Sequence, residues 1–173
     1  MKFLKYFLPL VLLVSACYQD NPKVRAARRV RNEVATNLKK TKNLRPIGSG
    51  GGMMDKIWVL SLSFNYYKEI DIEEGRKLLV DSVNEFSTTV NADEHIRPFL
   101  KEYPFGPNNI EVSIYLRNPD GSDPEGSKLQ VINALEGTLK YKIYDQEKHL
   151  KTICEETFEE ALKKISNGEK KSP

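Results

Sequence analysis

The chain has 173 residues and a net charge of +3, a length that suits one domain plus a tether. The net charge hides an asymmetry, because residues 18–45 carry a charge of +7 and residues 46–173 a charge of −6. No catalytic or cofactor motif is visible in either part, which disfavours the enzyme classes that such motifs mark. Location, architecture and electrostatics are therefore what the residues describe best.

The first segment is basic and then apolar. Lys2 and Lys5 precede an apolar core over residues 6–14, which is about half of the roughly 20 residues needed to span a bilayer. The core ends in Val14-Ser15-Ala16-Cys17. This stretch resembles the signal peptide and lipobox of bacterial lipoproteins. The resemblance implies that residues 1–16 are removed and that Cys17 carries the lipids; the alternative is an ordinary secretory signal cut after Ala16.

A lipidated Cys17 implies a location and excludes a disulfide. Two or more acyl chains hold a protein stably on a membrane. We therefore expect a lipid-anchored protein of the cell membrane or the outer membrane, with its domain facing the periplasm or the exterior. Tyr18 stands where an aspartate would retain enteric lipoproteins in the inner membrane, which favours the outer membrane. Cys154 is then the one remaining cysteine, so no intramolecular disulfide is expected.

Residues 17–54 are predicted to be a lipid-anchored basic tether followed by a glycine-rich linker. Apolar residues recur at helical spacing in this arm: Val24, Ala27, Val30, Val34 and Leu38. The stripe is thin, so a solvated arm is favoured over a basic helix that binds anionic lipid through residues 23–45. A nucleic-acid partner is disfavoured by export. Residues 46–52 have the composition of a flexible linker rather than of a phosphate-binding loop.

The folded domain is predicted over residues 55–166, with a polar tail over 167–173. Residues 56–67 alternate with period two, with Trp58, Leu60 and Phe64 on the buried side. Asp71 and Glu74 then form a capping-box pattern that starts a helix over 72–91. This helix has a single apolar stripe: Leu79, Val83, Phe86 and Val90. A shorter helix is expected over 92–103.

Strand patterns follow over 110–117, 128–136 and 139–143, with short breaks that favour antiparallel hairpins. A last helix is expected over 150–165, with Glu155, Glu156, Glu159 and Glu160 on its solvated face. The order is β-α-α-β-β-β-α. It predicts an α+β two-layer sandwich, in which an antiparallel four-stranded sheet carries helices on one face.

Candidate catalytic and metal-binding groups are few. His95, His149 and Cys154 show no spacing that would pair a nucleophile with a base, and Cys154 borders an apolar stripe as a structural thiol would. The loop over 118–126 has several oxygen ligands but lacks the spacing of a calcium loop, so we interpret it as a turn. We predict no cofactor, no metal and no catalytic residue.

Tyr67 and Tyr115 are the candidate partner-binding residues, because they lie on the less apolar sides of their strands. An aromatic patch on an open sheet face could bind an envelope protein or a glycan; the alternative is that these rings cover the edge of the core. The sequence thus favours a non-enzymatic binding or scaffolding module. The alternatives are a hydrolase whose site is assembled from distant loops and a carrier of a small apolar ligand.

Overall fold

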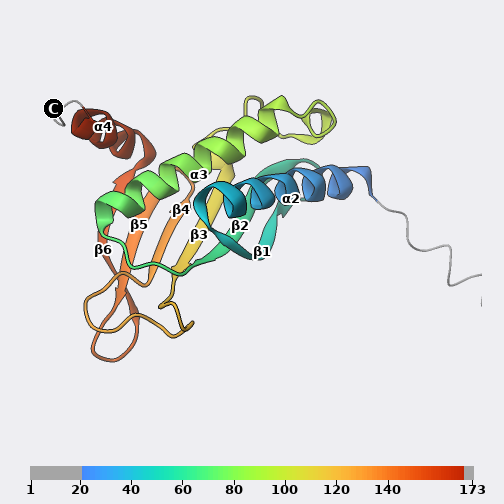
Figure 1. The fold of residues 1–173 in the computed structure, drawn as a ribbon. Helices are drawn as coiled ribbons and strands as arrows, with labels where there is room; N and C mark the ends of the chain where they lie inside the picture. The colour runs from blue at the N-terminus through green and yellow to red at the C-terminus, as the bar shows by residue number, and fades with distance from the viewer. Residues whose placement is uncertain (1–20, 170–173) are drawn as a thin grey trace, which may run out of the picture.

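A six-stranded sheet carries the fold, and its strands lie in chain order from β1 to β6 (Figure 1). The structure, a computed structural model, describes residues 21–169. The strands are β1 (Arg45–Met53), β2 (Ile57–Tyr66), β3 (Ile110–Leu116), β4 (Val131–Leu135), β5 (Thr138–Tyr144) and β6 (Leu150–Thr157). The helices are α2 (Pro22–Lys42), α3 (Ile72–Ala92) and α4 (Phe158–Glu169), with two short 3-10 helices, η2 (Arg97–Phe99) and η3 (Pro107–Asn109). The α+β class is therefore confirmed.

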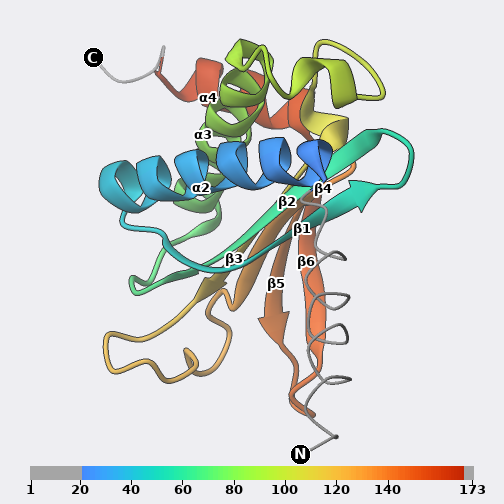
Figure 2. The same ribbon diagram turned by 90° about the vertical axis from the view of Figure 1, so that its right-hand side faces the viewer.

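The helices form one layer over the sheet (Figures 1 and 2). Helix α2 packs on β1 and β2, α3 packs on β3 to β5, and α4 packs on β5 and β6. The alternation within β3 shows which face is buried: Ile110, Val112 and Ile114 are fully buried, whereas Glu111 and Ser113 are half-buried on the other face. The core lies between the two layers because each helix and the sheet present one apolar face.

The central helix agrees with the sequence. Asp71 accepts a hydrogen bond of 2.8 Å from the main-chain N–H of Glu74, and the Glu74 carboxylate accepts one from the N–H of Asp71. This reciprocal pair satisfies two main-chain donors at the helix start. The predicted stripe is fully buried: Leu79, Val83, Phe86 and Val90. The helix over 72–91 is thus confirmed, as are strands at 57–66, 110–116, 131–135 and 138–144.

The sheet differs from the predicted one in size and in strand direction. It has six strands instead of four, and β2 pairs with β3 in parallel while every other neighbouring pair is antiparallel. A parallel pair needs a crossover connection, and α3 supplies it between β2 and β3. The short breaks later in the chain do lead to antiparallel pairs, as predicted.

The prediction of a tether and linker is wrong for residues 22–53. Asn21 caps α2, because its side chain accepts a hydrogen bond of 3.0 Å from the N–H of Lys23, and Pro22 occupies the first helical position. Ala27, Val30 and Val34 are fully buried against the sheet. The thin apolar stripe suffices since small side chains let the helix approach the strands closely. Residues 1–16 and Cys17 lie outside the described residues.

The last predicted helix is wrong over its first half. Residues 150–157 form β6, which pairs with β5, and only residues 158–169 are helical. Consequently Glu156 points into the core and is buried, instead of lying on a solvated helix face. The tail was predicted from residue 167, whereas α4 continues to residue 169.

Two smaller differences concern the segment before β3 and the start of β2. Residues 92–103 contain the short helix η2 instead of a regular helix, because Pro98 would lie in the interior of a helix over 92–103, where it has no N–H to donate. Trp58 was expected in the core but is 45% exposed, at a place where the β1–β2 pairing is irregular. Within residues 21–169, no helix has the length and apolar character needed to cross a membrane.

Candidate functional site

The face of the sheet that points away from the helices is the main candidate site. Cross-strand partners lie in rows over this face. One row contains Arg45, Asn65, Tyr115, Val131, Lys142 and Thr152, and the next contains Gly48, Ser63, Ser113, Asn133, Lys140 and Glu155. The second row starts with small side chains, so another surface can approach the backbone closely there. We call these two rows and Tyr67 the open face.

Tyr67 and Tyr115 both belong to the open face. Tyr115 is half-buried and is the Cα partner of both Asn65 and Val131. Tyr67 follows the end of β2, and the guanidinium carbon of Arg45 lies 4.9 Å from the centre of its ring. A guanidinium over an aromatic ring at this distance is attracted by the ring's quadrupole. Tyr115 therefore lies within the first row, and Arg45, the first residue of that row, lies over the ring of Tyr67.

Two side-chain amides on the open face are not satisfied. The Oδ1 atoms of Asn65 and Asn133 are buried and accept no hydrogen bond within residues 21–169. Asn133 as a whole is only 6% exposed. A buried acceptor without a donor costs about 1–3 kcal/mol of stability. The open face thus combines two buried acceptors without donors, small side chains towards its β1 edge, and the side chains of Tyr67 and Tyr115.

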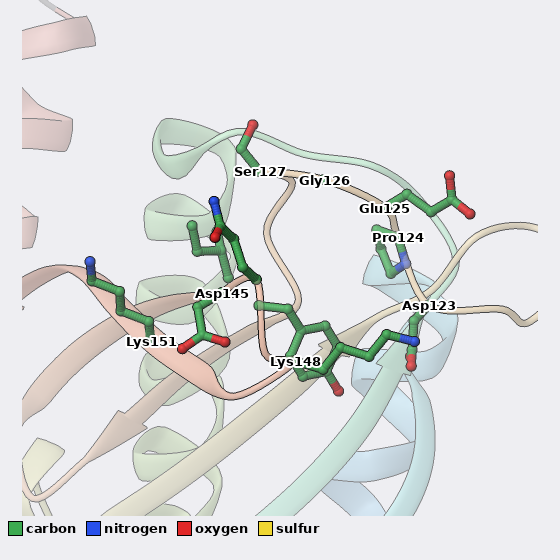
Figure 3. A pocket seen from close by; sticks show the side chains of 11 residues that line it. Asp123, Pro124, Glu125, Gly126, Ser127, Asp145, Lys148 and Lys151 are labelled. Carbon is green, nitrogen blue, oxygen red and sulfur yellow. The ribbon is translucent and has the colours of Figure 1, made fainter.

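A hollow of about 880 Å³ lies at the far end of the sheet from the β1–β2 turn (Figure 3). Its walls are the loop over 123–127 and the β5–β6 hairpin, and its lining includes the basic side chains of Lys148 and Lys151 and the acidic side chains of Asp123, Glu125 and Asp145. Two of these carboxylates are already engaged: Asp123 pairs with Arg117, and Asp145 accepts hydrogen bonds of 2.9 Å from the N–H groups of Glu147 and His149. These bonds, led by that from His149, hold the pKa of Asp145 below its usual value. We therefore interpret the hollow as the space left between the loop over 123–127 and the β5–β6 turn.

A cluster of charges is buried between α3, β5, β6 and α4. The carboxylate of Glu156 accepts hydrogen bonds from Nε of Arg76 and from the Tyr141 hydroxyl, each of 2.7 Å, and from Nζ of Lys164 at 2.6 Å. Arg76 also pairs with Glu73. The side chain of Glu156 is 1% exposed and that of Arg76 is 4% exposed. The four elements are thereby joined through one carboxylate.

The electrostatics of this cluster favour the charged forms. Burial would raise the pKa of Glu156, but the hydrogen bonds from Arg76, Lys164 and Tyr141 outweigh burial and hold the pKa below its usual value. Burial would likewise lower the pKa of Arg76, yet Glu156 and Glu73 raise it. The pKa of Tyr141 is raised by burial and by its hydrogen bond to Glu156. A carboxylate held ionised by three donors is a structural anchor rather than an acid-base catalyst.

The structure does not bring the other candidate residues together. His149 lies in the exposed turn between β5 and β6, where its ring is 3.5 Å from Glu147. Cys154 lies five residues further along β6, which corresponds to about 16 Å of extended strand, and its thiol is free and half-buried. His95 lies beyond the end of α3, at the opposite end of the sheet. These positions give no catalytic pair among the three residues.

The loop over 118–126 is held as a turn. Asp120 accepts hydrogen bonds from the N–H and the hydroxyl of Ser122, of 2.9 and 2.7 Å, and the N–H of Asn118 donates to the Ser122 carbonyl at 2.9 Å. Within residues 21–169, no three His, Cys, Asp or Glu side chains are grouped so as to hold a metal ion.

Asn65, Asn133 and Arg45 are the residues of the open face that the sequence did not single out. Asparagine is depleted in strands, so Asn133 between Ile132 and Ala134 is a signal that could have been used. Arg45 has no such signal, because it is one of nine basic residues between positions 23 and 45 and does not stand out among them. Comparison of the chain with protein-family models, with curated proteins and with solved structures gave no match.

Proposed function

We propose that the protein is a lipid-anchored, non-enzymatic binding module of the bacterial cell envelope, and that it binds a partner protein through its open face. The anchor is supported by the Val14-Ser15-Ala16-Cys17 pattern and its apolar core, with Cys17 as the lipid-bearing residue. Helix α2 begins at Pro22, so the domain follows Cys17 almost directly. The domain is therefore held close to the membrane instead of at the end of a long tether.

The main support for the proposed binding role is the position of Tyr115 next to two unsatisfied amide oxygens. Its strand neighbour Asn65 and the nearby Asn133, on the next row, each have a buried amide oxygen with no donor. Natural proteins satisfy the great majority of buried acceptors, and exceptions need a reason. Because both oxygens are covered in the free protein, a partner that displaces the side chains over them and offers its own N–H or O–H groups would supply that reason.

A protein fits this face better than a small ligand does. Sites for small molecules are concave, whereas the second row of the open face has only the small side chains of Gly48, Ser63 and Ser113 over β1 to β3. Tyrosine and arginine are enriched in protein–protein contacts. Arg45 and Tyr115 lie in the same row and provide those residue types.

Site-specific photo-crosslinking in cells tests the binding role. A photoreactive phenylalanine analogue in place of Tyr115 is expected to give one discrete, protease-sensitive adduct. The same analogue in place of Lys39, which is exposed on α2 away from the sheet, is the matched control. The double variant Tyr67→Ala, Tyr115→Ala should then fail to copurify with the partner so identified, with an unchanged circular dichroism spectrum. An adduct shared by both positions, or a protease-resistant one, contradicts a protein partner on the open face.

Fractionation tests the anchor separately. The Cys17→Ala variant is expected to move from the membrane fraction to the soluble fraction, because the apolar core over residues 6–14 is too short to span a bilayer and residues 21–169 contain no membrane-spanning helix. Mass spectrometry of the wild-type N-terminal peptide should find Cys17 acylated. A Cys17→Ala variant that stays in the membrane fraction contradicts the lipid anchor.

A further inference from the structure

The β1–β2 turn, the start of α2 and the segment after α3 meet at one end of the domain (Figure 2). Nζ of Lys23 donates hydrogen bonds to the main-chain oxygens of Met54 and Asp55. The N–H of Lys101 donates to the Ile57 carbonyl at 2.8 Å. We call this region the hairpin end and define it by residues 22–24, 53–58 and 97–103.

Large apolar side chains are exposed at the hairpin end. Met54 is 84% exposed, Tyr103 is 54% exposed and Trp58 is 45% exposed. The indole of Trp58 rests directly on the backbone of Gly52, since a Cβ atom there would overlap the ring. The buried side of the ring therefore fixes its orientation, while its outer side faces solvent. The exposed side chains of Met54 and Trp58 form an apolar tip, and a contiguous exposed apolar patch is typical of a protein or membrane contact.

The charges around these side chains are mainly positive. The hairpin end contains Lys23, Lys56, Arg97 and Lys101 against Asp55 and Glu102. Lys56 and Lys101 are exposed, and Nζ of Lys56 is held 2.7 Å from the Pro98 carbonyl. An apolar tip with a basic surround complements an anionic lipid surface.

The short chain between Cys17 and α2 limits how far the hairpin end can lie from the membrane. Four residues separate Cys17 from Pro22, so their Cα atoms are at most about 18 Å apart even in a fully extended chain. A lipidated Cys17 sits at the headgroup level of the bilayer. The start of α2, and with it the hairpin end, is then kept within about 18 Å of the headgroup level.

We infer that the hairpin end is a membrane-contact surface: Met54 and Trp58 enter the interfacial layer of the bilayer, and Lys23, Lys56 and Lys101 face anionic headgroups. This inference rests on the proposed lipid anchor. Tryptophan prefers the interface because its ring is apolar while its N–H can still hydrogen-bond. The strands run from this end to the loops at 117–130 and 145–149, so those loops and the hollow point away from the membrane (Figures 1 and 2).

Trp58 is the one tryptophan of the chain, so its fluorescence reports on this surface directly. The protein, expressed as the full chain and purified in its lipidated form, is placed in vesicles of phosphatidylethanolamine and phosphatidylglycerol with brominated acyl chains. Relative to the Cys17→Ala protein in buffer, Trp58 emission should shift to shorter wavelength. It should also lose intensity compared with vesicles of unbrominated lipid, and iodide in the buffer should quench it less. Met54→Asp should reduce the shift and the lipid quenching.

A reporter at the other end of the strands is the matched control. The variant Trp58→Phe, Tyr144→Trp moves the tryptophan to the last residue of β5, far from the hairpin end. Its emission should be unaffected by brominated lipid and should remain open to iodide. If the protein floats with the vesicles but Trp58 is not quenched, or the tryptophan at position 144 is quenched instead, the membrane-contact surface is overturned and the anchor stands. If the wild type does not float, both proposals fail together.

Discussion

Nε of Arg76 donates a hydrogen bond of 2.7 Å to Oε1 of Glu156, although the two residues are 80 positions apart in the chain. The bond joins α3 to β6 inside the core. The Tyr141 hydroxyl donates a second hydrogen bond to Oε1 of Glu156. Nζ of Lys164, on α4, donates one to the other carboxylate oxygen, Oε2. Helix α4 is thereby tied to α3 and the sheet through one buried carboxylate, in addition to the buried apolar side chains of Phe158 and Ala161.

Glu156→Gln should lower the free energy of unfolding by about 3 kcal/mol, because it leaves the guanidinium of Arg76 buried without its main counter-charge. Glu73 still contacts Arg76 and limits the loss. Urea denaturation measures it. Glu155→Gln is the matched control: Glu155 is 53% exposed and lies 3.4 Å from Lys140, so its loss should cost less than about 1 kcal/mol. Equal effects of the two variants would show that Glu156 is not the buried partner.

The same carboxylate predicts a pH dependence of stability. The pKa of Glu156 in the folded protein lies below its ordinary value of 4.5. Its contribution to stability is therefore fully present above pH 4.5 and is lost as the pH falls through the lower pKa of the folded state. The difference in unfolding free energy between wild type and Glu156→Gln should shrink over that range. A difference that stays constant below pH 4.5 would contradict the assignment.

Glu156 also shows why part of the fold was not predictable from the sequence. The segment over 150–165 satisfies a helical apolar spacing, and a run of glutamates normally lies on a solvated face. As a strand, however, the same residues place Cys154 and Glu156 on the core side, next to Tyr141 and Leu139. A buried glutamate becomes favourable only when a distant arginine is near it, and the spacing within one segment carries no such information.

The starts of two wrongly predicted helices, α2 and α4, are marked by local sequence patterns. Thr157 and Glu160 form a capping pair, with hydrogen bonds of 2.8 and 3.2 Å, and the Thr-x-x-Glu pattern marks the start of α4. Asn21-Pro22 likewise marks the start of α2. The glycines of β1 gave no signal for a strand, because glycine is depleted in strands. The helix α3 was predicted correctly because its cap and its wide apolar stripe agree. Of the open face, Tyr67 and Tyr115 were identified from alternation alone.

Leu38→Ala tests whether α2 belongs to the folded domain. Leu38 is 1% exposed, so its truncation should lower the free energy of unfolding by about 2–5 kcal/mol in urea denaturation. Lys39→Ala, at the exposed neighbouring position, should stay within about 0.5 kcal/mol of the wild type. If the arm were a solvated tether, neither substitution would change stability.

Gly51→Ala tests whether residues 45–53 form an ordered strand. Gly51 has a φ angle of +146°, and a Cβ atom there would overlap the carbonyl oxygen of Val59. The backbone must shift, so we expect a loss of about 1–3 kcal/mol and a changed emission of the nearby Trp58. Gly106→Ala is the control, because Gly106 has a φ angle of −121° and open space where the Cβ would lie. It should be neutral or stabilising by up to about 1 kcal/mol. Two equally tolerated alanines would indicate a flexible linker.

Asn133→Leu separates stability from binding on the open face. The Oδ1 atom of Asn133 is buried without a donor, so an apolar side chain of similar shape should leave the unbound domain as stable as the wild type or raise its unfolding free energy by about 1 kcal/mol. The same change removes an acceptor that the partner is proposed to use, so the photo-adduct formed at Tyr115 should weaken or disappear.

Gln130→Leu is the contrasting variant. Gln130 also has an unsatisfied oxygen, but its Nε2 donates a hydrogen bond of 2.6 Å to the Pro124 carbonyl and so holds the loop over 118–129. Its loss should destabilise the domain by about 1–2 kcal/mol while the adduct at Tyr115 persists. Asn133→Leu is thus expected to preserve the unfolding free energy and weaken binding, whereas Gln130→Leu is expected to lower the unfolding free energy and leave binding intact. Loss of stability in Asn133→Leu with an intact adduct would mean that Asn133 serves the fold and that the open face binds its partner elsewhere.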